Sequence, residues 1–236
     1  MGWAQRVMVF LNVATQLVLI NVLWLLGTLA GGVVLGVLPA SVSAARLVTA
    51  LFLGSPSDAL WRDFWLWWQH SWASAHRRGW PFGVVVVLSV ADLWAFRVAQ
   101  LNDLQTATFF LIPFLVVTAL SAVAFSFFLA TELRYRDTFA ATWRFVLLAP
   151  LTFVGTSAAI LLVLTAFMML TWQFPLAVVL AGWVVPVALP AVMAGSSLDR
   201  RLAPGFPPDD ALLTNADAER LARITSRSDQ GGSVAP

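Results

Sequence analysis

Long apolar runs separated by short polar segments dominate the chain. A bilayer core about 30 Å thick takes roughly 20 residues of helix at a rise of about 1.5 Å per residue. Five runs reach this length, and a sixth is interrupted by Gly36, Pro39 and Arg46. The pattern predicts an all-α fold, a polytopic membrane helical bundle of about six transmembrane helices, with spans near 7–31, 33–53, 81–101, 107–130, 151–171 and 174–195.

The run at 33–53 fits a full crossing least well. Pro39 suits the first position of a helix, where its missing N–H costs nothing. A helix from Pro39 to Leu53 would be only about 22 Å long, which is short for a full crossing. We therefore expect this segment to be tilted, shortened or packed inside the bundle.

Composition narrows the class further. The chain has 236 residues, of which 60% are hydrophobic and 11% charged, and it has no Cys. These values exclude an ordinary soluble domain, disulfides, thiolate metal sites and cysteine nucleophiles. All 14 basic residues are Arg, and no basic run outside the predicted spans is interleaved with aromatic residues, so we expect no nucleic-acid partner.

Arginine placement orients the predicted spans. Positively charged residues are enriched in the cytoplasmic loops of membrane proteins. Arg97 lies near one side of the predicted bundle, and the arginines of the opposite side are Arg6, Arg62, Arg77, Arg78, Arg134, Arg136, Arg144, Arg200 and Arg201. We therefore expect a multi-pass protein of the bacterial plasma membrane with both termini in the cytoplasm. Residues 42–44 resemble a signal-peptide cleavage site, but the apolar run before them is far longer than the usual 7–15 or so residues, which favours a retained first span.

A tryptophan-rich segment follows the second run. Trp61, Trp65, Trp68 and Trp72 have the spacing i, i+4, i+7 and i+11, which places them on one helical face. The segment predicts an interfacial amphipathic helix at 58–78. Two interpretations stay open: the four Trp form a membrane-interface anchor, or the helix couples the bundle to a soluble partner.

Two further cytoplasmic segments are predicted. The stretch 137–148 is amphipathic, and Pro150 should kink or break the chain before the fifth span. From residue 199 the composition becomes polar, which predicts an integral membrane domain over 1–198 and a mostly disordered cytoplasmic tail over 199–236.

Polar residues inside predicted spans are candidate site residues, because they are costly in lipid. Asp92 lies close to the middle of the third span and Arg46 lies in the second segment. We expect either that they pair across the bundle interior, or that Arg46 reaches the headgroups while Asp92 is protonated or solvated. Asn21 in the first span is a third candidate, with helix–helix packing as its alternative role.

No arrangement of residues indicates catalysis or a bound group. His70 and His76 do not share a face, and no nucleophile-and-base grouping or phosphate-binding loop is present in the sequence. We therefore expect no enzyme activity, no cofactor, no catalytic residues and no metal ligands.

Three short motifs carry a family resemblance: Asn21-Val-Leu-Trp24, Gly36-Val-Leu-Pro-Ala-Ser41 and Asp63-Phe-Trp65. In their order and approximate spacing they resemble the YesL-like family of bacterial integral membrane proteins, a domain of unknown function. Asp92-Leu93 is similar to a pair in many members, and the resemblance extends roughly from Gly2 to Leu198. The sequence departs from the family pattern at Ser41, where Thr is usual, and at 68–72, which is more aromatic and less basic.

The resemblance implies a companion of carbohydrate ABC importers and gives no site residues to carry over. We therefore expect the lipid bilayer and ABC importer subunits as partners. A small-solute transporter or channel that uses Asp92 and Arg46 is the alternative.

Overall fold

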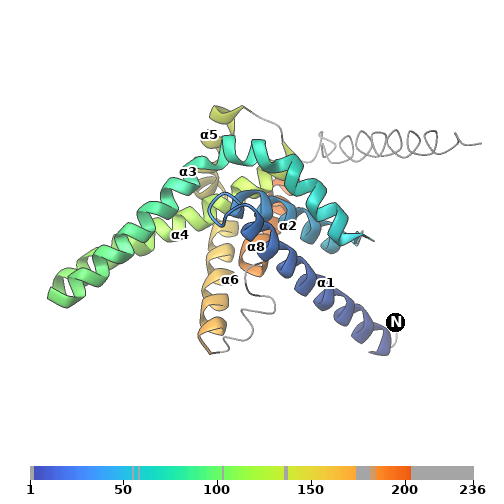
Figure 1. Cartoon of the computed structure of the whole chain (residues 1–236), viewed down its shortest axis with the longest axis horizontal. Coiled ribbons are helices and arrows are strands. Elements are labelled where there is room, and N and C mark those ends of the chain that lie inside the picture. The colour runs from blue at the N-terminus through green and yellow to red at the C-terminus, as the bar shows by residue number, and fades with distance from the viewer. Residues whose placement is uncertain are drawn as a thin grey trace, which may run out of the picture.

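The computed structural model describes residues 3–54, 56–57, 59–102, 104–135, 138–173, 182 and 184–202. Every regular element in these residues is an α-helix, which confirms the all-α prediction (Figure 1). The helices are α1 (Trp3–Ala30), α2 (Val37–Phe52), α3 (Leu60–Asn102), α4 (Leu104–Arg134), α5 (Phe139–Thr152), α6 (Val154–Gln173) and α8 (Val184–Leu202).

Four helical segments in the described residues are long and apolar enough to cross a bilayer: Val7–Ala30, Leu60–Val98, Leu111–Arg134 and Val154–Gln173. The helices α2 and α5 are apolar but shorter. The chain is therefore a multi-pass membrane protein by helix length and hydropathy. The first part of the predicted span near 174–195 lies outside the described residues. Nearly all of the predicted tail lies outside them as well.

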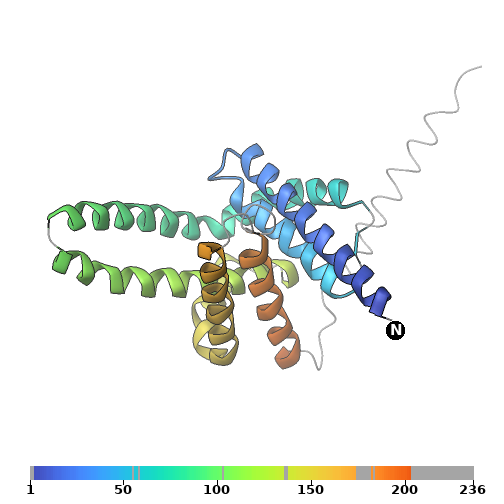
Figure 2. The same cartoon turned by 90° about the horizontal axis from the view of Figure 1, so that it is seen from below.

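The helices extend in different directions from a shared centre (Figures 1 and 2). The second half of α3 and the first half of α4 form a two-helix hairpin that extends away from the other helices, here called the arm (residues 84–102 and 104–120). Two other helices, α6 and α8, lie side by side below the centre in Figure 1. Most of the described side chains of the arm are exposed, as lipid-facing side chains should be.

The predicted interfacial helix and third span are one continuous helix in the structure. Residues 60–102 are helical throughout, including Pro81, so the elements predicted separately at 58–78 and 81–101 are parts of one helix. Proline removes one backbone hydrogen bond and favours a bend rather than requiring an end. The ribbon of α3 is accordingly bent at its middle (Figure 1).

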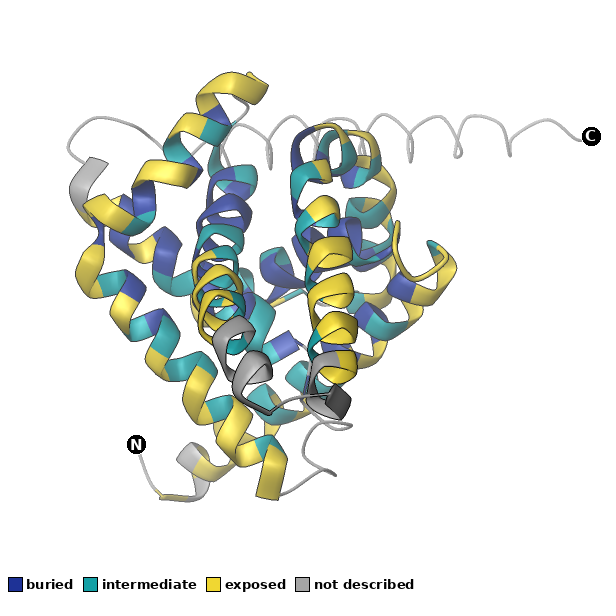
Figure 3. Ribbon diagram, turned by 90° about the vertical axis from the view of Figure 1, so that its left-hand side faces the viewer, coloured by how far each residue is buried: buried dark blue, intermediate teal, exposed yellow. Residues whose placement is uncertain are grey.

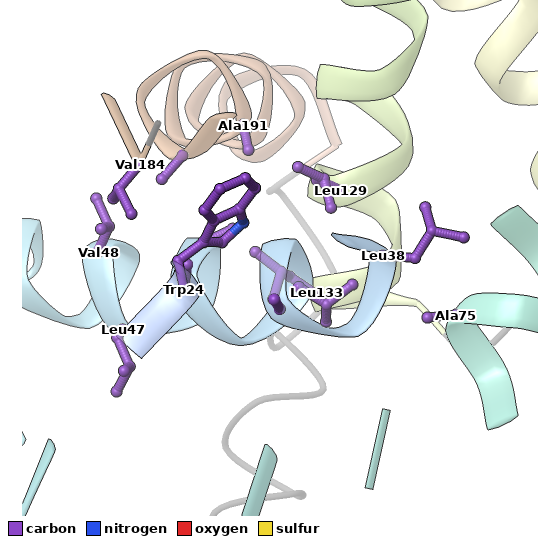
Figure 4. Close-up of a cluster of buried hydrophobic side chains, with 14 of the residues drawn as sticks. Trp24, Leu38, Leu47, Val48, Ala75, Leu129, Leu133, Val184 and Ala191 are labelled. Carbon is purple, nitrogen blue, oxygen red and sulfur yellow. The ribbon is translucent and has the colours of Figure 1, made fainter. Parts of the chain in front are cut away.

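The short helix α2 lies inside the bundle. It packs against α1, α3 and α8, and its buried residues run from Leu38 to Val48 with the exception of Arg46 (Figure 3). Trp24 of α1 belongs to the same buried cluster as Leu38, Leu47 and Val48 of α2, and this cluster is drawn in Figure 4. This confirms the prediction that the second segment is shortened and packed inside, because its 16 residues cover only about 24 Å.

Glycines allow the tight connection between α1 and α2. A Cβ at Gly36 would lie 2.2 Å from the carbonyl oxygen of Thr28, a distance no side chain tolerates. Gly32 has a φ of 72°, in the left-handed region that favours glycine. The backbones of the two helices can therefore approach closely enough for α2 to fold back on α1.

The predicted break near Pro150 is present three residues later, at Phe153. Thr138 caps the N-terminus of α5 by accepting a hydrogen bond from the amide of Ala141, and Pro150 lies in the last turn. The chain leaves helical geometry at Phe153, and α6 begins at Val154. The hydroxyl of Ser157 lies 3.1 Å from the carbonyl oxygens of both Pro150 and Phe153, so acceptors at this break are satisfied.

Candidate functional site

The predicted tryptophan face is a continuous ladder of rings along the first half of α3. Successive ring centroids from Trp61 to Trp65, Trp68, Trp72 and His76 are 6.0, 5.3, 4.6 and 4.7 Å apart. Aromatic pairs at these separations attract each other edge to face or in tilted geometry. The four Trp therefore stiffen this half of the helix.

This ladder faces the bundle instead of forming a free surface. A Cβ on Gly27 of α1 would lie 3.2 Å from the Trp68 ring, and one on Gly31 would lie 3.2 Å from the Trp72 ring. Trp65 and Trp68 pack against the buried core, whereas Trp61 is 61% exposed. Trp68 and Trp72 thus pack toward the C-terminal end of α1 and Trp65 packs against the core, while anchoring in the membrane interface stays a prediction for all four Trp.

The opposite side of the same helical half is exposed. This outer face of α3 consists of Arg62, Leu66, His70, Ala73 and Arg77, which follow the helical spacing i, i+4, i+8, i+11 and i+15. Phe64 and Ala75, on the buried side, have no exposed surface. Inward packing therefore leaves a surface with two arginines, one histidine and one leucine.

Arg46 lies against this half of α3. Its guanidinium carbon is 3.5 Å from the centroid of the Trp67 ring, a cation–π contact. Arg46 is half-buried, in a helix whose other central residues are buried. An aromatic face and apolar surroundings therefore hold its charge within the bundle.

Asp92 lies in a cavity in the arm. The cavity has a volume of about 300 Å³ and is lined by Asp92, Leu93, Ala95, Phe96, Leu111, Pro113, Phe114 and Val117. Asp92 is exposed and is the one ionisable residue among the described residues of this lining. It therefore places a carboxyl group among apolar and aromatic side chains.

Arg46 and Asp92 do not pair in the structure, so the pairing hypothesis is wrong for this conformation. Trp67, which Arg46 contacts, precedes Asp92 by 25 residues of one continuous helix. This is a helical path of about 37 Å at 1.5 Å per residue. The hypothesis estimated membrane depth from the boundaries of the predicted spans, and this put both residues at similar depth. In the structure α3 begins at Leu60, and Arg46 contacts its first half whereas Asp92 lies in its second half.

Asn21 is fully buried where α1 meets the start of α8. Its side-chain oxygen accepts a hydrogen bond from the backbone amide of Val184 at 3.3 Å. The first amides of a helix lack intrahelical acceptors, so Asn21 caps α8 from another helix. Trp24, one turn later, donates through Nε1 to the hydroxyl of Ser41 at 3.2 Å. Residues from two motifs of the family resemblance thus meet in the core.

The most buried ion pair in the described residues joins α3 to α4. Arg78 Nη1 is 2.9 Å from Glu132 Oε2, and the two side chains are 8% and 5% exposed. The indole of Trp143 in α5 donates a hydrogen bond to the carbonyl oxygen of Arg78 at 2.8 Å. The residues where three helices converge are therefore fixed by charge as well as by packing.

A second ion pair joins α4 to α8, and its α4 residue is two positions after Glu132. Arg134 donates through Nε and Nη2 to the two carboxylate oxygens of Asp199 at 2.9 and 3.0 Å. A Cβ on Gly195 would lie within 2.4 Å of this guanidinium, so the absence of a side chain there leaves room for Arg134. This two-pronged geometry is the favoured arrangement of arginine with a carboxylate.

Sequence reasoning missed Glu132 and Asp199. Both are acidic residues at the charged end of an otherwise apolar helix, within two residues of an arginine. That signal was available: a carboxylate among arginines on the side rich in positive charge is a candidate ion-pair partner. That Glu132 pairs with Arg78 and Asp199 with Arg134 depends on helix packing, which cannot be read from the sequence.

The arrangement can do two things chemically. The outer face of α3 can contact an acidic or mixed polar surface, and the Asp92 cavity can hold an apolar group that carries a positive charge. Among the described residues no group of three His, Asp or Glu could hold a metal ion. Helix length, hydropathy and these polar contacts define a multi-pass helical membrane protein with a packed centre and a projecting arm.

Within that class, residues 17–93 match the sequence model of a family described as "Protein of unknown function, DUF624". The match covers about a third of the chain and includes the three motifs as well as Asp92. It shows similarity to a family of unknown function over this segment, whereas the YesL-like resemblance and its extension to residue 198 stay predictions. No curated protein matches the chain, and no solved structure does.

Proposed function

We propose that the protein is a non-catalytic membrane accessory subunit that docks on a partner at the inner membrane surface. The observation that supports this most is the inward rotation of the tryptophan ladder. Because Trp65, Trp68 and Trp72 pack toward α1 and the core, the outer face of α3 is left for contact. This favours the coupling-helix interpretation over an interfacial anchor.

The chemistry of the outer face fits a protein surface. Arg77 is exposed, and Arg62 is 69% exposed although it lies 3.5 Å from Asp63. Leu66 adds an exposed apolar side chain that is 42% accessible. A basic and partly apolar stripe of this kind suits a partner with acidic residues around a small apolar hollow.

A carbohydrate ABC importer is the proposed partner. This part of the proposal rests on the YesL-like resemblance, since the match at residues 17–93 concerns a family of unknown function. A helix with the outer face described above could engage such an assembly at its cytoplasmic side.

A transporter or channel is the second candidate function, and the Asp92 cavity is the observation that favours it. Arg46 does not contribute to that cavity, because it contacts Trp67 in the other half of α3. A transport site built from both residues would require a different conformation. Solute flux in liposomes that contain only this protein would support this candidate.

Photocrosslinking from native membranes tests the docking proposal. A photoreactive amino acid is placed at His70 on the outer face, and at Ser71 on the buried side as the matched control. We expect residue 70 to crosslink to an importer subunit and residue 71 to give only intramolecular products.

The charge of the face is tested in the same membranes. Arg77→Gln should reduce the crosslink at residue 70, whereas Arg97→Gln, an exposed arginine of the arm, should leave it unchanged. A crosslink from residue 70 to lipid alone would contradict docking. Equal effects of both substitutions would contradict recognition by the outer face.

A further inference from the structure

The cavity in the arm has the size and lining of a small-molecule site. Its volume of about 300 Å³ is at the lower end of the range for ligand pockets. The wall consists of aliphatic side chains and two aromatic rings, Phe96 and Phe114, which come from different helices. A ligand there would contact α3 and α4 at once.

Asp92 is the polar feature of this wall. Among the described residues its carboxyl group has no ion pair and no hydrogen bond, and the side chains opposite on α4 are Leu111, Pro113, Phe114 and Val117. An ionisable group inside a membrane span is costly and marks a functional site by default. A positive charge beside the carboxylate would offset that cost.

We propose that the Asp92 cavity binds a lipophilic organic cation of small to medium size, one that carries aromatic rings. The carboxylate supplies the opposite charge, and the faces of Phe96 and Phe114 attract cations as well as aromatic rings. Because the described lining is apolar apart from Asp92, a cation there meets the carboxylate in a less polar medium than bulk water, which strengthens the electrostatic attraction. Such ligands reach the site through the lipid that surrounds the arm.

Other ligand classes fit the lining poorly. A sugar needs several hydrogen-bonding side chains, and the described residues of the lining offer one polar side chain. A metal ion needs several oxygen or nitrogen ligands, which the described residues do not bring together here. An anion would be repelled by the carboxylate. The inference goes beyond the proposed docking function and does not depend on it, because the cavity and the outer face lie in different halves of α3.

Binding to the full-length protein in lipid nanodiscs tests the proposal. The probes are methyltriphenylphosphonium and triphenylphosphine oxide, which are similar in size and differ in charge. Empty nanodiscs measure partition into lipid. The variants are Asp92→Asn, Asp92→Glu and, as a control for general surface charge, Asp199→Asn, which removes a carboxylate that is 53% exposed outside the cavity.

We expect saturable binding of the cation. The neutral probe should bind with an affinity at least about tenfold lower, because it lacks the charge-assisted contact with the carboxylate. Asp92→Asn should lower the affinity for the cation by a similar factor. The affinities of Asp92→Glu and Asp199→Asn for the cation should stay within about threefold of that of the unaltered chain. Equal binding of the two probes, or binding of the cation no greater than in empty nanodiscs, would overturn the proposal. The comparison of probes on the unaltered chain decides the question even if a variant fails to fold.

Discussion

Arg46 of α2 lies over the indole of Trp67 in α3, with the guanidinium carbon 3.5 Å from the ring centroid. This contact fixes a charged residue of the buried helix α2 to the first half of α3. It also separates Arg46 from Asp92, which lies in the other half of that helix. The two ionisable residues that the sequence singled out therefore belong to different parts of the molecule.

The Arg46–Trp67 contact should be measurable as a coupling energy. Arg46→Met keeps the apolar stem and removes the charge, and Trp67→Leu removes the ring. We expect a double-mutant cycle in detergent to give a coupling of about 0.5–2 kcal/mol, the range for cation–π contacts. Additive effects of the two substitutions on the free energy of unfolding would contradict the contact.

Breaking the Arg78–Glu132 pair should be among the most damaging single changes. Glu132→Gln leaves the buried Arg78 charge uncompensated, and we expect a loss of about 3–5 kcal/mol of unfolding free energy. The double variant Arg78→Met/Glu132→Gln should recover part of this loss, because no buried charge then remains. Arg134→Met, which breaks the pair with the 53% exposed Asp199, is the comparison and should cost clearly less. A double variant less stable than Glu132→Gln would argue against the pair.

Asn21 should prove structural. Asn21→Ala removes the acceptor for the first amide of α8, and we expect a cost of about 0.5–2 kcal/mol, as for other helix caps. Asn12 on the same helix is exposed, so Asn12→Ala should change the unfolding free energy by less than about 0.5 kcal/mol. Thermal unfolding in detergent can compare the two, and equal costs would show that the capping contact contributes nothing.

The helical nature of the chain and the burial of its second segment could be predicted from the sequence, because run length and hydropathy report directly on the cost of placing backbone in lipid. The ladder of Trp61, Trp65, Trp68 and Trp72 also follows from spacing. Its direction does not, since helical periodicity says which residues share a face and not which neighbour that face meets. That Trp68 and Trp72 lie against Gly27 and Gly31 is therefore visible only in the structure.

Long-range pairing was beyond the sequence for a related reason. Asn21 and Val184 are separated by 163 residues, and no local pattern links them. The continuity of α3 was missed because the third predicted span began at residue 81, although proline inside a helix is tolerated when neighbouring helices support it. Once the two halves are joined, the separation of Trp67 from Asp92 follows from helix geometry, whereas the contact of Arg46 with Trp67 depends on the packing of α2 on α3.

The α1–α2 connection should tolerate no side chain at Gly36. Gly36→Ala would place a Cβ 2.2 Å from a backbone oxygen of Thr28, and we expect a loss of at least about 1–3 kcal/mol as the helices separate. Gly83 has nothing within 4 Å of its Cβ position, so Gly83→Ala should leave stability unchanged or raise it slightly. Similar melting temperatures for the two variants would contradict the close approach of α1 and α2.

Cysteine labelling tests the central claim most directly, because the chain has no native Cys to interfere. Single variants His70→Cys on the outer face and Ser71→Cys on the buried side are treated with a membrane-impermeant maleimide, in intact cells and in inverted membrane vesicles. The account predicts that residue 70 is labelled rapidly and only in inverted vesicles, while residue 71 is protected in both. Labelling of residue 70 from outside the cell, or equal labelling of both residues in inverted vesicles, would contradict a cytoplasmic outer face and an inward tryptophan ladder.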